Sequence, residues 1–159
     1  MISYQTASPG APLVRIETET PVPSGSQVLI KMVACGVCHS DIHIHEGVFE
    51  LGNDKQLNVA QEGMVLGHEI FGEVVAVGED VDSVQIGDRR VVYPWIGCGE
   101  CALCRRGEEQ LCTPGRALGI VTKGGFADHV LVPDARYLFD KGGISDSLAA
   151  TYACSGLTA

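Results

Sequence analysis

The sequence lacks three things: long hydrophobic runs, a secretion signal and an excess of positive charge. No apolar run approaches the roughly 18 residues of a membrane-spanning helix, and residues 1–5 have neither a basic nor an apolar signal region. There are 11 Lys and Arg against 20 Asp and Glu, which gives a net charge of −9. Nucleic acids and anionic membranes, which bind basic patches, are therefore poor partners. We expect a cytoplasmic protein that acts on a small molecule.

Cysteine and glycine, by contrast, are well represented, with seven and 20 residues respectively. An odd number of cysteines without a secretion signal disfavours disulfides and predicts a reducing compartment. Glycine-rich turns between Val- and Ile-rich runs predict short strands rather than helices. At 159 residues the chain has the size of one domain. The composition thus predicts a single, mainly β domain over residues 1–159.

Four of the cysteines form the pattern C-x2-C-x2-C-x7-C. Four thiolates around one tetrahedral ion are typical of a structural zinc site without a free coordination position. An iron–sulfur cluster is the main rival, because ferredoxin runs also open with C-x2-C-x2-C, and Pro114 follows the last cysteine. The final spacing of seven rather than three residues disfavours it. We predict a structural zinc lobe over residues 94–115 with these ligands: Cys98, Cys101, Cys104 and Cys112.

The same stretch also matches a degenerate dinucleotide fingerprint through Gly97, Gly99 and Ala102, after the apolar run 91–93. Because the positions between the glycines hold cysteines and no amphipathic helix follows, we reject this match.

The pattern of apolar residues and turn signals predicts the order of the remaining elements. Strands are expected over 2–5, 13–17, 27–34, 70–78, 91–93, 124–132 and 137–139, which suggests a small closed barrel or sandwich. Residues 47–63 are expected to form an irregular surface loop. Short helices are expected over 42–46, capped by Ser40 or Asp41, and over 148–154, capped by Ser145. Gly67 is expected to bend the backbone and present His68.

Several short motifs occur in an order that resembles the zinc-dependent medium-chain alcohol dehydrogenases, in the medium-chain dehydrogenase/reductase superfamily. The motifs are Gly36-Val37-Cys38-His39-Ser40-Asp41, Gly67-His68-Glu69, the four-cysteine lobe and Ala153-Cys154-Ser155-Gly156. The resemblance implies a GroES-like β-barrel with short helices and the inserted zinc lobe, carrying two zinc ions. The family's Rossmann domain has no counterpart within these 159 residues. We expect a truncated chain in which residues 145–159 begin the connection to that domain.

The resemblance also assigns a catalytic zinc to Cys38, His68 and Cys154. Two thiolates and one imidazole leave a fourth position for water or an alcohol oxygen. The resemblance implies that Asp41 is the hydrogen-bond partner of His68, that Ser40 and His43 relay the proton of the alcohol, and that Glu69 is a transient zinc ligand. It also implies that His39 contacts the cofactor pyrophosphate and that Phe49 and Trp95 form walls of the substrate pocket.

Structural interpretations stand beside these assignments. Cys35 forms a C-x2-C pair with Cys38, but we predict that it is a small buried hydrophobe. His45 and His129 are predicted to be surface or structural residues. Ser40 is also a candidate helix cap, and Phe49 and Trp95 are also candidates for packing alone.

The function implied is the reversible oxidation of an alcohol to an aldehyde or ketone, with hydride transfer to NAD or NADP. We expect residues 1–159 alone to be inactive and the full-length enzyme to be a homo-oligomer. The alternatives are another reductase or polyol dehydrogenase of the superfamily, and a non-catalytic, zinc-stabilised GroES-like binding module. An open metal site speaks against the binding module, which has no use for one.

Overall fold

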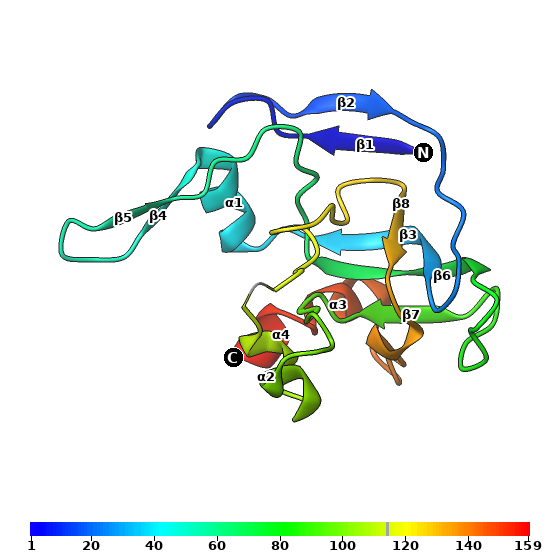
Figure 1. The fold of residues 1–159 in the computed structure, drawn as a ribbon. Coiled ribbons are helices and arrows are strands. Elements are labelled where there is room, and N and C mark those ends of the chain that lie inside the picture. Colours follow the sequence, from blue (N-terminus) through cyan, green and yellow to red (C-terminus); the bar gives the residue numbers. More distant parts are fainter. Residues whose placement is uncertain (114) are drawn as a thin grey trace.

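A five-stranded antiparallel sheet forms the body of the protein. The computed structural model describes residues 1–113 and 115–159, so Pro114 of the predicted lobe lies outside the described residues (Figure 1). The sheet has the order β8-β3-β6-β7-β9. Its strands are β3 (Val28–Gly36), β6 (Glu69–Val77), β7 (Arg89–Val92), β8 (His129–Val132) and β9 (Leu138–Phe139). The long central pair β3 and β6 brings Gly36 opposite Glu69, where the loop after one strand meets the start of the other.

The first two strands, β1 (Ile2–Gln5) and β2 (Val14–Glu17), form a separate antiparallel pair. Single bridges join β1 to the rest of the chain, from Ser3 to Ala127 and from Gln5 to Val65. The prediction of a mainly β fold with short helices is confirmed.

The strand predicted over 124–132 is shorter than expected, because β8 begins only at His129. Gly124 and Gly125 instead lie against the backbone of Gly67, with Gly125 N–H donating to the Gly67 carbonyl at 2.7 Å. A Cβ atom on Gly124 would lie 2.2 Å from that carbonyl oxygen. This close backbone approach requires glycine and takes the segment away from the sheet ladder.

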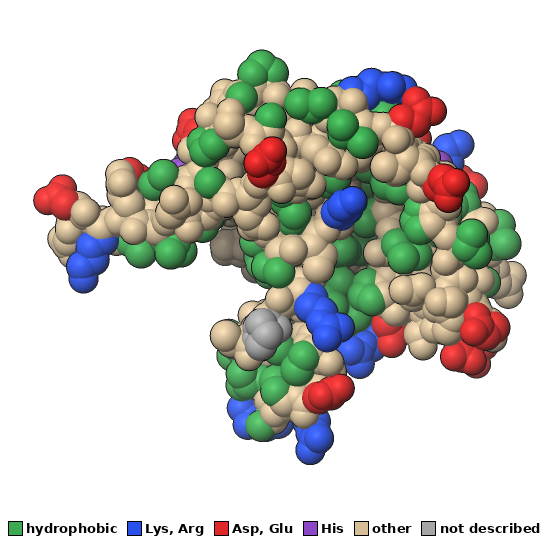
Figure 2. All heavy atoms as spheres, turned by 45° about the horizontal axis from the view of Figure 1, so that its top comes forward, with side chains coloured by type: hydrophobic (Ala, Val, Ile, Leu, Met, Phe, Trp, Pro, Cys, Tyr) green, Lys and Arg blue, Asp and Glu red, His purple; other side chains and the backbone are tan. Residues whose placement is uncertain are grey.

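The prediction of an irregular loop over 47–63 is wrong in part. The segment contains a hairpin of β4 (Val48–Glu50) and β5 (Gln56–Asn58), which projects from the body as an arm (Figures 1 and 2). Its turn places Asn53 and Asp54 at positive φ. All three residues of β5 are exposed, so the hairpin lacks the alternation of buried and exposed positions by which sequence reasoning finds a strand.

Helix α1 (His39–Glu46) begins three residues before the predicted start. Its N-cap is Cys38, so the prediction of Ser40 or Asp41 at this position is wrong. The Asp41 carboxylate, in the first turn, accepts a hydrogen bond from Cys38 N–H at 2.9 Å. The helix ends at Gly47, which adopts a left-handed φ of 85°.

The helix predicted over 148–154 starts two residues earlier and ends at Thr151, so residues 152–154 form a turn before a second short helix. Helix α3 (Asp146–Thr151) follows Ser145, whose side chain makes no cap hydrogen bond, and α4 (Ser155–Thr158) follows Cys154. The remaining short elements are α2 (Ala102–Arg105), η1 (Glu109–Leu111) and η2 (Ala135–Tyr137). No helix within the described residues is long and apolar enough to cross a membrane.

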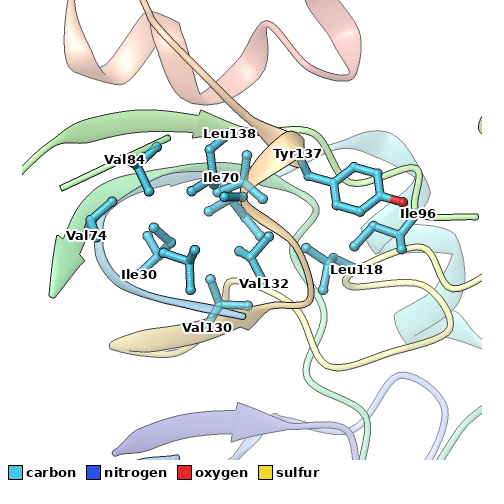
Figure 3. Packing of buried hydrophobic residues seen from close by; sticks show 13 residues of the cluster. Ile30, Ile70, Val74, Val84, Ile96, Leu118, Val130, Val132, Tyr137 and Leu138 are labelled. Atoms are coloured by element: carbon cyan, nitrogen blue, oxygen red, sulfur yellow. The ribbon is translucent and has the colours of Figure 1, made fainter. Parts of the chain in front are cut away.

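Hydrophobic clusters lie on both faces of the sheet. The larger one contains Ile30, Ile70, Val74, Val130 and Val132, with Tyr137 at its edge (Figure 3). The smaller one joins β6 and β7 to α3; its members are Phe71, Val91, Ala149, Ala150 and Ala153. Because the alanines of α3 are buried against the sheet, the residue that follows them, Cys154, is held near the start of β6.

Candidate metal centres

The four cysteines of the lobe converge on one point. Their sulfur atoms all lie within 4.8 Å of one another. Three of the Sγ–Sγ distances are 3.5, 3.8 and 3.9 Å. A tetrahedral zinc ion with Zn–S bonds of about 2.3 Å would separate its sulfurs by about 3.8 Å. The four residues therefore fit such an ion, and the dinucleotide interpretation of the same glycines fails. A Cβ on Gly97 would lie 2.5 Å from Cys104 Sγ, so this glycine makes room for a sulfur atom.

Backbone N–H groups point at these sulfurs. Cys98 Sγ accepts from Glu100 and Cys101 N–H groups at 3.4 Å each, and these bonds lower the pKa of Cys98 to about 6. The Cys112 thiol accepts from Cys98 N–H at 3.3 Å, but burial and the three neighbouring thiols outweigh that bond and raise its pKa to about 12. Four thiolates crowded together need a cation to ionise together, and a divalent ion supplies that charge.

A side-chain network ties the lobe to the hydrophobic core beside the sheet. The hydroxyl of Tyr137, at the edge of the core cluster, donates to the Glu109 carboxylate at 2.5 Å. Arg136 donates to the same hydroxyl at 2.7 Å and forms an ion pair with Glu109 at 3.2 Å. Glu109 lies between the third and fourth cysteines of the lobe, so the position of the lobe depends on a side chain of the core.

A second cluster brings together residues that are far apart in the sequence: Cys38, His68 and Cys154. Their ligand atoms lie within 4.8 Å of one another. The two sulfurs are 3.9 Å apart, and His68 Nε2 lies 3.2 Å from Cys154 Sγ. Around a tetrahedral zinc ion these distances are about 3.8 and 3.6 Å. The three side chains therefore also fit zinc, with three protein ligands rather than four.

Asp41 fixes the imidazole of His68. Its Oδ1 lies 3.2 Å from His68 Nδ1 and accepts from Gly67 N–H at 3.0 Å. Both side chains are almost completely buried, at 2% and 0% exposure. A proton held on Nδ1 by the carboxylate leaves the lone pair of Nε2 free to face the sulfurs, and metal-binding histidines usually have such a carboxylate behind the ring. Gly67 adopts a φ of 89°, as expected for the bend that presents His68.

The electrostatics of this cluster favour a bound cation. The pKa of Cys154 is raised to about 12 by burial and by the charge of Cys38. Burial also opposes ionisation of Cys38, but the Ser40 N–H and His68 outweigh it and lower the Cys38 pKa. Burial would lower the pKa of His68, but the hydrogen bond to Asp41 outweighs it and raises that pKa. The His68 imidazole thus lies among two thiols and a carboxylate, those of Cys38, Cys154 and Asp41, in a buried place. A divalent cation would balance the negative charge that these groups carry when they ionise.

Glu69 lies behind the cluster and is held by Ser155. Its carboxylate, 2% exposed, accepts hydrogen bonds from the Ser155 hydroxyl and from Ser155 N–H, the latter at 3.2 Å. Gly36 makes room for it, because a Cβ there would lie 2.0 Å from Glu69 Oε2. Sequence reasoning assigned no role to Ser155 or Gly36. The motifs that contain them were the available signal. The contact of Gly36 with Glu69 depends on the pairing of β3 with β6, and that of Ser155 depends on the packing of α3 against β6.

The remaining predicted residues lie in different places around the second cluster. Ser40 and His43 lie on α1, and the His43 ring lies 4.4 Å from the exposed His39 ring and 5.0 Å from the Phe49 ring, between centroids. The Trp95 ring lies 6.0 Å from that of His68, so this side chain is beside the cluster. Phe49 instead packs against Ile44, Met64 and Leu66.

The other cysteine and the two other histidines lie outside both clusters. Burial raises the pKa of the Cys35 thiol to about 12, and this side chain packs against the core. His45 Nε2 lies 2.7 Å from the Ala11 carbonyl, and His129 pairs with Asp128 at 2.9 Å.

Comparisons with known proteins agree on one family. Residues 24–141 match the family model described as "Alcohol dehydrogenase GroES-like domain". An NAD-dependent alcohol dehydrogenase of Sulfurisphaera tokodaii is 44% identical over 154 residues, which cover 94% of this chain and 43% of the relative. An L-threonine 3-dehydrogenase of Pyrococcus horikoshii is 34% identical over 133 residues, which cover 84% of this chain and 37% of the relative.

A solved structure gives the same answer. The cobalt- and zinc-bound thermostable alcohol dehydrogenase from Pyrobaculum aerophilum superimposes with a TM-score of 0.79 at 32% identity. The match covers 99% of this chain and 45% of that protein. The chain therefore spans less than half the length of the relatives that it matches.

Proposed function

The chain belongs to the alcohol dehydrogenase GroES-like domain family, and we propose that it is the catalytic-domain portion of a zinc-dependent alcohol dehydrogenase. The reaction proposed is the reversible oxidation of an alcohol to an aldehyde or ketone, with hydride transfer to NAD or NADP. The observation that carries this proposal is the convergence of Cys38, His68 and Cys154, with Asp41 behind the imidazole. The match to an NAD-dependent alcohol dehydrogenase supports the reaction class.

Two zinc ions are proposed for the chain, with different tasks. The four cysteines of the lobe would hold one ion by all four positions, which serves the fold. The three-ligand cluster would hold the other with one position open. When bound there, zinc supplies a Lewis acid that makes the hydroxyl of an alcohol more acidic. The metal-bound Pyrobaculum aerophilum relative supports the choice of metal.

The residues around the open cluster then have separate tasks in the proposal. Ser40 accepts the proton of the alcohol, and His43, one turn further along α1, passes it towards solvent. Asp41 keeps the His68 ring in one orientation and one tautomer. Trp95, beside His68, forms a wall of the substrate pocket. Phe49 contacts His43 and is proposed as the outer wall.

Glu69 and His39 complete the proposed site. Glu69 is buried and held by Ser155 in the present arrangement, and we assign it a transient ligand role that requires this hydrogen bond to break. His39 is exposed at the start of α1 and is proposed to contact the cofactor pyrophosphate.

Residues 1–159 alone are not expected to bind NAD or NADP or to turn over an alcohol. In this family the cofactor rests on a Rossmann domain, with its pyrophosphate at a glycine-rich helix N-terminus. The only match to such a fingerprint in the sequence surrounds the lobe cysteines. We further propose a homo-oligomer for the full-length protein and a cytoplasmic setting. The cytoplasmic setting rests on the odd number of cysteines, seven, which disfavours a disulfide framework.

Replacement of zinc by cobalt(II) tests the proposed function without any need for turnover. An open tetrahedral site gains a ligand when imidazole is added, and its visible absorption bands shift, whereas a closed four-thiolate site does not respond. We expect two equivalents of cobalt and an imidazole-dependent shift that is lost in His68→Ala and retained in Cys101→Ser. Visible absorption bands that do not shift when imidazole is added would mean that no open site exists, and the proposal of catalysis would fail.

A further inference from the structure

A pocket outside both metal centres lies between β8, the segment before β3 and the loop 116–124. Its volume is about 440 Å³, which is within the range of small-molecule sites. On the face shown in Figure 2, hydrophobic side chains lie inside a central hollow with Lys and Arg side chains beside it. None of the predicted site residues lines this pocket among the described residues.

The floor of the pocket is apolar. Ile96, Leu118 and Val130 line it, and all three belong to the larger core cluster (Figure 3). Val65, which is 1% exposed, also contributes. The floor is thus the buried edge of the hydrophobic core, and the partly exposed apolar side chains of the pocket lie around it: Met1, Pro21 and Leu131.

The rim carries two cations without an ionic partner. Arg116 and Lys123 line the pocket and are exposed, and neither side chain has an ion pair or hydrogen bond within the described residues. Six of the 11 Lys and Arg residues, by contrast, pair with a carboxylate: Arg15, Arg89, Arg90, Arg106, Arg136 and Lys141. Glu19 is the one carboxylate among the described residues that line the pocket. The rim is therefore a locally basic place on a chain with a net charge of −9.

The loop that holds these two cations is closed by its own hydrogen bonds. The hydroxyl of Thr122 donates to the Arg116 carbonyl at 3.1 Å, and Gly119 N–H donates to the Thr122 carbonyl at 2.7 Å. Because the loop returns on itself, its first and last side chains lie at the same pocket. Gly119 also packs on the backbone of Gly67, where a Cβ would lie 2.4 Å from the carbonyl oxygen. The loop that carries the two cations is thus held in one conformation, so less conformational entropy is lost when a ligand binds.

We propose that this pocket binds a small amphipathic anion, with a carboxylate or phosphate head and a short apolar chain. The guanidinium of Arg116 matches either head group with two parallel hydrogen bonds, and Lys123 adds a second charge. The apolar chain would lie on the floor and remove the partly exposed apolar side chains around it from water. A neutral alcohol would contact only the apolar floor, and inorganic phosphate would contact only the two cations of the rim. The proposal does not depend on the proposed dehydrogenase function.

The test uses the zinc-loaded chain and four probes: octanoate, octyl phosphate, octanol and inorganic phosphate. Calorimetric titration measures affinity, and amide chemical shifts locate the site. We expect the two amphipathic anions to bind at least about tenfold more tightly than octanol or phosphate, because each charge-assisted bond contributes that much or more. Shifts should concentrate at Leu118, Lys123 and Val130. The stronger of the two amphipathic anions identifies the head group.

Matched variants decide whether the rim cations are responsible. Arg116→Gln and Lys123→Gln should each weaken octanoate binding about tenfold, whereas Arg105→Gln, which removes an equal charge outside the pocket, should not. Unchanged affinity in both pocket variants would overturn the proposal, as would equal binding of octanol. Shifts confined to Cys38 and His68 would also overturn it, because they would place the carboxylate at the open metal site. Zinc content and circular dichroism establish that each variant is folded, and the two single variants provide independent readings.

Discussion

The two candidate metal centres of this chain share cysteine ligands but are assembled in opposite ways. The lobe takes its four cysteines from 15 consecutive residues, 98–112, most of them held by local N–H–sulfur bonds. The second centre takes its three ligands from 117 residues, 38–154, and depends on β3, β6 and α3 to bring them together. The ion would hold the local segment of the lobe together, whereas the fold brings the three ligands of the distributed site together. Removal of metal should therefore damage the fold in the first case and the chemistry in the second.

The largest expected effect is that of breaking the local site. Cys101→Ser removes one of four ligands from a segment with few other contacts, and loss of a structural metal costs about 4 kcal/mol or more. For a chain of this size that corresponds to a fall in Tm of roughly 8–16 °C. Calorimetric melting measures it. Cys35→Ala, at a cysteine outside both clusters, is the control and should keep two zinc equivalents. An unchanged Tm in Cys101→Ser would show that the lobe holds no structural ion.

Breaking the distributed site should cost metal but less stability. His68→Ala removes a buried ligand, and zinc content should fall from two equivalents to one. The accompanying loss of stability should be about 1–3 kcal/mol, since a small cavity replaces the ring. Elemental analysis and melting are measured on the same preparation. His129→Ala removes an imidazole outside both clusters and should leave zinc at two equivalents. Retention of two equivalents by His68→Ala would contradict the ligand assignment.

A change behind the ligand sharpens the comparison further. Asp41→Asn keeps an acceptor for Gly67 N–H but removes the charge that orients His68. Loss of the group that orients a ligating histidine reduces metal affinity roughly 10–100-fold. Competition with a chelator should therefore show a lower zinc affinity at one of the two sites. The chain offers a close control, because Asp128 and His129 form a similar pair outside the metal centres. Equal zinc affinity in Asp41→Asn and Asp128→Asn would remove Asp41 from the site.

The smallest expected effect concerns the attachment of the lobe. Tyr137→Phe deletes the hydroxyl that joins Glu109 and Arg136 to the core. The free energy of unfolding should fall by roughly 0.5–1.5 kcal/mol, because the Glu109 carboxylate loses one hydrogen bond and keeps its ion pair with Arg136. Zinc content should stay at two equivalents, since no ligand changes. Denaturant unfolding measures the difference. Loss of lobe zinc in this variant would mean that the core holds the lobe cysteines in place.

The same contrast explains what the sequence predicted and what it did not. The lobe was predictable from spacing alone, because all its ligands lie in one short segment. The bend at Gly67 was predictable because glycine tolerates the φ that presents His68. Cys154 required resemblance to a family, since nothing local marks it as a ligand. The hydrogen bonds from Ser155 to Glu69 require α3 to pack against β6 first, which sequence reasoning does not supply.

Errors in the predicted elements have equally physical causes. The arm of β4 and β5 was missed because its strands bury few residues and so show no alternation. The start of α1 was misplaced because Cys38, an uncommon N-cap, occupies the position that Ser40 and Asp41 were expected to hold. The pocket beside Arg116 and Lys123 was not predicted, because a closed loop brings together two cations that are seven residues apart.

The rate of zinc release to an excess of chelator tests the central distinction most directly. Two phases of one equivalent each are predicted, because the open site exposes its ion to attack and the closed site does not. The fast phase should disappear in His68→Ala, and the slow phase should disappear in Cys101→Ser. A single phase of two equivalents, or a fast phase that survives in His68→Ala, would contradict the account of one closed and one open zinc site.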